Sequence, residues 1–409
     1  MKTAPKNTAH LLSYPEQTHW KSLLAKYGAE RAFDIDAYHA ILSPDVPDFL
    51  QDYLDTPAMQ RLDGAGLLCG TDWTPLYRNR FYYSRLDHSK GAALIIWHFT
   101  RDKVQTLSAL FHDIATPAFS HVIDFKNGDH LTQTSTENRT EAVIRSSKEI
   151  CALLRRDGIP IEKISDYHVY PIADNDLPRL SADRLEYMFP SGAALLGSWT
   201  LDEIATVYGC IKIMRNEDGQ EELGFTDAEA AALYTEKFLE TALVLQLNED
   251  KLTLQLLAQI ISSAEKAAII RPQDLYALSE KEIMRRFDIA ARREPRNSTS
   301  GAFSANNDDG ALVLSVKMAP AERAAYAEFC ALYRTFVRMT DIIRSDEPLR
   351  GCFCVNLAVK QRWINPLVQE NGMPSPRRIA GLYPKTAAFI KAFLDFKDAP
   401  YGCVRLTNS

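Results

Sequence analysis

The sequence has few cysteines, no long apolar run and no excess of basic residues. Its seven cysteines occur singly except for Cys352 and Cys354, and none belongs to a CxxC pair. A disulfide framework and a thiolate zinc site are therefore not expected, and reduced thiols predict a cytoplasmic location. The most apolar run, 92–97, is too short to cross a bilayer, and the first residues lack the apolar segment of a signal peptide, so neither membrane anchoring nor export is expected.

The charge balance argues against a partner that binds through a general positive field. The chain of 409 residues carries 47 basic and 53 acidic side chains, a net charge of -6. Nucleic acid is therefore not expected as a partner, although a local basic pocket stays open. Apolar residues make up 46% and charged residues 24%, values that are typical of a folded globular protein.

Apolar residues recur at helical spacing through most of the chain. The pattern predicts helices over 86–99, 103–112 and 252–270, with His88 on the inward stripe of the first. Capping-box spacing at Thr226 and Ser279 predicts two further helix starts. At least two-thirds of the chain therefore looks all-α, with few strands there, and the expected fold class is mainly α.

The composition changes near residue 293, where Ser, Asn, Asp and Gly become frequent. This change predicts a flexible loop over 291–310. Beyond it, alternation predicts strands over 311–318 and 352–360, with a helix over 321–343 between them. We therefore expect four parts: an N-terminal helical extension (1–55), a helical core with accessory helices (56–290), the loop (291–310) and a small α/β appendage (311–409).

Two histidines and two aspartates stand in apolar helical contexts: His88, His112, Asp113 and Asp183. A buried imidazole or carboxylate costs several kcal/mol unless it is paired, hydrogen-bonded or bound to a metal. Such a set suits a divalent ion with room left for water, and nitrogen and oxygen ligands leave open whether that ion is Mn, Fe, Ni, Zn, Co or Mg. A single histidine on an apolar face is more often a satisfied core residue, so the ordered set carries the prediction.

The order His, His-Asp, Asp, with spacings of 24 and 70 residues, resembles the HD-domain superfamily of metal-dependent phosphohydrolases. The flanking residues extend the resemblance: 84–91 (SRLDHSKG), 110–114 (LFHDI) with 119–121 (FSH), and 182–187 (ADRLEY). These stretches look most like the deoxynucleoside triphosphate triphosphohydrolase branch. The resemblance implies a helical HD core and hydrolysis by a metal-activated water.

The resemblance also implies roles for single residues. His88, His112, Asp113 and Asp183 would be metal ligands, and Asp113, His121 and Glu137 would serve catalysis. His121 would be oriented by Asp124 in the way that carboxylates often orient imidazoles. The residues that would bind substrate are Arg85, Lys90, His121, Arg184 and Tyr187.

The sequence departs from the branch at two positions. Thr116 and Thr136 stand where the family pattern has histidines, and a threonine cannot act as a general acid near neutral pH. Three interpretations stay open. In the first, the substrate has a better leaving group. In the second, His130, Glu137 or another group supplies the proton. In the third, the site has lost hydrolysis and serves as a metal-dependent or nucleotide sensor.

We therefore expect a phosphohydrolase that cleaves a phosphate ester or anhydride of a nucleotide or related compound. The alternative is a catalytically weak HD module that acts as a sensor or interaction protein. A nucleotide or other phosphorylated small molecule is the expected partner. Members of this branch assemble, so a homo-oligomer stays open.

Overall fold

The computed structural model describes residues 27, 33–77, 79–129, 131, 139–292 and 318–407. Within these ranges the fold is mainly α, which confirms the fold class expected from the sequence. No helix in this part of the chain has the length and apolar character needed to span a bilayer. Most of the expected loop, the expected strand over 311–318 except its last residue, and most of 1–32 lie outside the described residues.

Several helices before residue 170 begin at side chains that cap their first turns. Ser84 and Asp87 form a capping box at the start of α5 (Arg85–Thr100), and Asp102 caps α6 (Lys103–Phe111). The other helices of this part are α2 (Ile35–Leu42), α3 (Asp48–Leu54), α4 (Pro57–Gln60), η1 (Arg61–Gly64), η2 (Thr71–Trp73), α7 (Val122–Lys126), α8 (Thr140–Ser146), α9 (Lys148–Asp157), η4 (Ile161–Lys163) and η5 (Tyr167–Val169).

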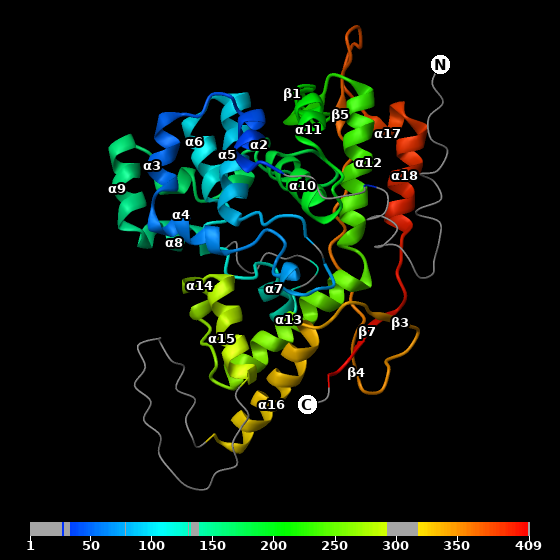
Figure 1. The fold of residues 1–409 in the computed structure, drawn as a ribbon. Coiled ribbons are helices and arrows are strands. Elements are labelled where there is room, and N and C mark those ends of the chain that lie inside the picture. Colours follow the sequence, from blue (N-terminus) through cyan, green and yellow to red (C-terminus); the bar gives the residue numbers. More distant parts are fainter. Residues whose placement is uncertain are drawn as a thin grey trace.

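The later helices complete the core. They are α10 (Ala182–Leu195), α11 (Leu201–Tyr208), α12 (Ala228–Val244), α13 (Asn248–Lys266), α14 (Asp274–Ala277), α15 (Glu280–Arg292), α16 (Pro320–Phe336), α17 (Ile379–Leu382) and α18 (Pro384–Asp395). Helix α5 packs against α6 and α10, α10 packs against α12, and α13 packs against α7 and α16. Figure 1 shows α12 beside α18, and α13 together with α15 and α16 in a separate group.

Two small sheets accompany the helices. The first has the order β1-β2-β5-β6, with β1 (Ile211–Arg215), β2 (Glu221–Phe225), β5 (Leu367–Val368) and β6 (Arg377–Arg378). The second has the order β3-β7-β4, with β3 (Ile343–Ser345), β7 (Tyr401–Arg405) and β4 (Cys352–Val355). Since β5 pairs in parallel with β2, the C-terminal segment is hydrogen-bonded to a hairpin of the helical region. The division into 56–290 and 311–409 stays a prediction.

Several local expectations need correction. Helix α16 ends at Phe336 instead of continuing to 343, because the chain then turns so that Thr74 Oγ1 bonds the carbonyl of Met339. Strand β4 stops at Val355 instead of 360, because its partner β7 is only five residues long. Asp227, not Thr226, caps α12. The hairpin β1–β2 is missing from the sequence-based expectation.

Candidate metal centre

Three helix ends meet at one point and carry the expected ligands. His88 lies in the first turns of α5, His112 is the C-cap of α6 and precedes Asp113, and Asp183 lies in the first turn of α10. The hydroxyl of Ser181 accepts a hydrogen bond from the backbone N–H of Arg184, and this bond fixes the start of α10. Local capping therefore sets where each ligand stands, and helix packing brings the ligands together.

The ligand atoms lie at the spacing that one bound ion requires. His88 Nε2 is 3.0 Å from His112 Nε2 and 3.2 Å from Asp183 Oδ1, and His112 Nε2 is 3.6 Å from the same oxygen. Asp113 Oδ2 lies 3.8 Å from His88 Nε2 and 3.6 Å from His112 Nε2. Atoms spaced in this way can share an ion at the usual distances of about 2.0–2.2 Å.

The hydrogen bonds of the two imidazoles leave both Nε2 atoms available to a cation. His112 Nδ1 lies 2.6 Å from the carbonyl oxygen of Ala109, which can only accept, so Nδ1 donates. His88 Nδ1 donates to the buried carboxylate of Glu186. In neutral imidazoles the two Nε2 lone pairs then face each other and a carboxylate oxygen, an arrangement that a divalent cation satisfies.

The charges around the site favour a positive centre. Burial lowers the pKa of His88, but Glu186 and Asp183 outweigh burial and raise that pKa to about 10. Burial raises the pKa of Asp183, but His88 and His112 bring it down to about 2. A cation placed between these groups would take over the role of the imidazolium proton.

Asp113 is held by two further residues. Arg85 Nη1 donates to its Oδ2 at 2.7 Å, and Thr116 Oγ1 donates to its Oδ1 at 2.9 Å. Burial would raise the pKa of Asp113, but Arg85, His112 and His88 keep it well below its usual range. Thr116, at a position where the resemblance predicts a histidine, thus orients the carboxylate of Asp113.

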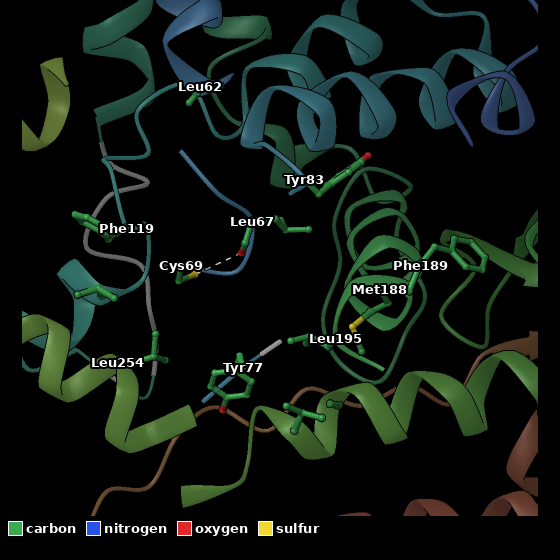
Figure 2. Packing of buried hydrophobic residues seen from close by; sticks show 14 of the residues in the cluster. Leu62, Leu67, Cys69, Tyr77, Tyr83, Phe119, Met188, Phe189, Leu195 and Leu254 are labelled. Carbon is green, nitrogen blue, oxygen red and sulfur yellow. Dashed lines mark hydrogen bonds between the residues drawn. The ribbon is translucent and has the colours of Figure 1, made fainter. Parts of the chain in front are cut away.

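The ligands open into a cavity of about 600 Å³. Four of the residues expected to bind substrate also line this cavity: Arg85, His121, Arg184 and Tyr187. Figure 2 shows Leu67, Cys69, Leu195 and Leu254 around one central region, and all four contribute to the cavity wall. The volume falls within the usual range of small-molecule sites, about 300–1,000 Å³.

His121 is presented by a strained turn and oriented by Asp124. Its Nδ1 lies 2.9 Å from Asp124 Oδ2, and burial together with Arg85 and Arg362 lowers its pKa although Asp124 opposes them. Phe119 and Ser120, the two preceding residues, have φ values of 64° and 44°. Such backbone costs free energy for residues with a Cβ and persists where the surroundings hold it.

Arg184 lines the cavity, but the neighbouring loop uses its guanidinium. Nη1 donates to Asn175 Oδ1 at 2.6 Å and to the carbonyl of Arg179 at 2.8 Å. Nη2 donates to Asp174 Oδ1 at 3.0 Å and also bonds the Asn175 carbonyl. The geometry gives Arg184 a role in holding the loop, and phosphate binding by this residue stays a prediction.

One expected residue, Lys90, does not line the cavity, and another lies outside the described residues. Lys90 is not among its lining residues, and its Nζ lies 3.9 Å from Asp36 Oδ1. The reason is helical geometry, since two residues correspond to about 200° around the axis and Lys90 points away from His88. Glu137, together with His130 and Thr136, lies outside the described residues.

The structure adds cavity residues that the sequence did not single out. His168 lines the cavity with its Nδ1 3.0 Å from Asp174 Oδ2, and the ring of neighbouring Tyr167 lies 5.1 Å from that of His112. Asp250 and Arg362 also line the cavity. Glu186, the partner of His88, was visible in the sequence as the acid three residues after Asp183.

Comparisons with known proteins found relatives of low sequence identity. No family model matches the chain. The metal-dependent phosphohydrolase cns2 of Cordyceps militaris is 22% identical over 251 residues, which cover 61% of this chain and 71% of that protein. Protein YdhJ of Bacillus subtilis is 30% identical over 146 residues, but the match spans only 34% of this chain and 41% of YdhJ.

Solved structures share the fold at low sequence identity. A phosphohydrolase from Bacteroides thetaiotaomicron superposes with a TM-score of 0.51 and 11% identity over 89% of this chain and 97% of its own. A hypothetical protein from Aquifex aeolicus superposes with a TM-score of 0.53 and 15% identity over 88% of this chain and 93% of its own. At these identities the likeness concerns the fold alone.

Proposed function

We propose that this protein is a metal-dependent phosphohydrolase that cleaves a phosphate ester or anhydride of a nucleotide or related compound. One observation carries the proposal: two imidazole Nε2 atoms and carboxylate oxygens converge on one point inside a small-molecule cavity. The similarity to a named metal-dependent phosphohydrolase supports the same reaction class. His88, His112, Asp113 and Asp183 would hold the ion.

The contacts around the ion site indicate a role for each neighbouring residue. A bound divalent ion supplies an activated water and polarises a phosphoryl oxygen. Arg85, held by Asp113 and by Ser120 Oγ at 3.1 Å, stands at the same end and would attract phosphate oxygens. Tyr187, whose ring lies 6.3 Å from that of His88, would contact the bound substrate.

The leaving group needs a proton. Thr116 cannot donate one near neutral pH, so another residue must supply it. His121 with Asp124 and His168 with Asp174 are two imidazole–carboxylate pairs on the cavity wall. We assign the proton transfer to His121, since it is part of the motif that follows the ligand pair. His168 is the second choice.

A weak or inactive module that binds metal and nucleotide is the second candidate function. The bond from Thr116 to Asp113 favours it, since this position holds a ligand instead of carrying a proton. The two candidates differ in turnover and not in metal binding.

The test is a metal analysis and an activity screen with purified protein. With Mn²⁺, Ni²⁺ or Co²⁺, the wild type should hydrolyse members of a phosphoester and nucleotide library. His112→Ala should lose both the metal and the activity. The control His98→Gln changes an imidazole near the other end of α5 and should keep both. Unchanged turnover by His112→Ala would disprove the proposal, and tight nucleotide binding without product would favour the second candidate.

A further inference from the structure

The cavity wall also contains apolar residues. Leu195, Leu245, Leu254 and Val359 are among them. The segment that carries Val359 is held in place because Gln246 Nε2 donates to the carbonyl of Lys360 at 2.9 Å. When the phosphate group of a substrate lies beside the ion, the rest of the substrate can contact these apolar residues.

Asp250 is a buried carboxyl of the cavity wall. It lies in the first turn of α13, is 6% exposed and lines the cavity. Within the described residues its carboxyl accepts no hydrogen bond, and the electrostatic partners are Arg362, Lys251 and Glu249. Buried carboxyls normally have hydrogen-bond donors, so this one is placed to receive them from a ligand.

The Asp250 carboxyl is subject to opposing electrostatic effects. Burial raises its pKa to about 7, although Arg362 and Lys251 lower it. Arg362 also lowers the pKa values of His121 and Tyr187, and these three residues line the cavity together with Asp250.

The cavity lining suits a substrate that combines a phosphate group with an organic part. A carboxylate repels phosphate oxygens, whereas Arg85 and a divalent ion attract them. Hydroxyl and amino groups are donors that a buried carboxyl binds well. The leucine side chains of the cavity wall suit apolar surface on the organic part.

We propose that Asp250 is a specificity residue that accepts hydrogen bonds from a hydroxyl or amino group on the organic part of the substrate. The inference rests on the proposed phosphohydrolase function and narrows its substrate class. The substrate is a phosphate compound whose organic part has apolar faces and a hydrogen-bond donor.

A kinetic comparison tests the assignment. Asp250→Ala should lower kcat/KM for nucleoside phosphates roughly tenfold or more, as expected when a hydrogen bond to a charged group is lost. It should leave hydrolysis of p-nitrophenyl phosphate, which has no such donor, almost unchanged. Asp250→Asn, which keeps one acceptor oxygen, should fall between wild type and Asp250→Ala.

A control separates recognition from helix stability. Asp48 is an exposed acid in the first turn of α3, so Asp48→Asn removes a comparable interaction with a helix N-terminus. It should leave both substrates unaffected. An equal loss for both substrates in Asp250→Ala, or no loss for nucleoside phosphates, would overturn the assignment.

Calorimetry with nucleosides gives a readout that does not need hydrolysis. The wild type should bind a nucleoside such as adenosine or guanosine, and Asp250→Ala should weaken that binding by roughly tenfold or more. Asp250-dependent binding in a protein without turnover would refute the proposed hydrolase but keep the specificity residue. Hydrolysis without any effect of Asp250 would refute the specificity residue alone, as would failure of the wild type to bind any nucleoside or nucleotide.

Discussion

Glu186 joins His88, a proposed metal ligand, to the hydroxyl of Tyr83. One carboxylate oxygen accepts from His88 Nδ1 and the other from the Tyr83 hydroxyl. Glu186 is fully buried; burial raises its pKa, and His88 opposes that shift. The carboxylate therefore fixes both the tautomer and the orientation of the imidazole.

This contact predicts that Glu186→Gln weakens metal binding. The amide loses the negative charge that raises the basicity of His88, so the metal dissociation constant should rise about 10- to 100-fold. Competition with a chromophoric chelator measures it. Glu203→Gln, which removes a partly exposed carboxylate at the start of α11, is the control. Equal metal affinity in Glu186→Gln and wild type would contradict the predicted role.

Gly91 makes room for this carboxylate. A Cβ at position 91 would lie 2.8 Å from Glu186 Cγ and 2.9 Å from its Cδ. We expect Gly91→Ala to displace Glu186, destabilise the fold by about 1–3 kcal/mol and weaken metal binding. Denaturant unfolding and chelator competition measure the two effects.

The matched control is Gly381→Ala in α17. A Cβ there would meet only Arg377 Nη2 at 3.9 Å, so metal affinity should not change. If Gly91→Ala bound metal as tightly as this control, Glu186 would not depend on the space at position 91.

Glu280 predicts a pH dependence of stability. Burial and the nearby Asp72 raise its pKa from 4.5 to about 7, although its oxygens accept from the backbone N–H groups of Gly66 and Phe119 and from Trp73 Nε1. Between about pH 4.5 and 7 the folded state thus binds more protons than the unfolded state. This carboxyl makes stability fall as pH rises through that window.

The difference between wild type and Glu280→Gln isolates this contribution. The amide does not titrate, so the free energy of unfolding of wild type relative to the variant should decrease from pH 4.5 to 7 and stay constant above it. Urea unfolding at several pH values measures the difference. A difference that does not vary with pH would show that the carboxyl has an ordinary pKa in the folded protein.

His121 is expected to transfer the proton to the leaving group. His121→Asn should lower kcat by about 10²- to 10⁴-fold with little change in KM, and should remove one limb of the pH–rate profile. Asp124→Asn should have a smaller effect, because it alters the orientation of the imidazole without removing it. His168→Asn is the comparison, and a larger loss there would move the assignment to His168.

The sequence alone determined two of the helices that carry the proposed ligands. Helical spacing of apolar residues and local caps place α5 and α6 within one residue of the expected bounds. The ordered set His88, His112, Asp113 and Asp183 followed from motif spacing, and these residues converge in the structure. Such features depend on residues close together in the chain, so the local sequence contains them.

The tertiary structure decided how the remaining residues are used. Lys90 points away from the cavity toward Asp36. Arg184 donates hydrogen bonds to a neighbouring loop, and Thr116 donates one to Asp113. Asp250 and Arg362 are 112 positions apart in the sequence, and both line the cavity. Contacts over such separations arise from the packing of whole helices and segments, which local spacing and capping do not specify.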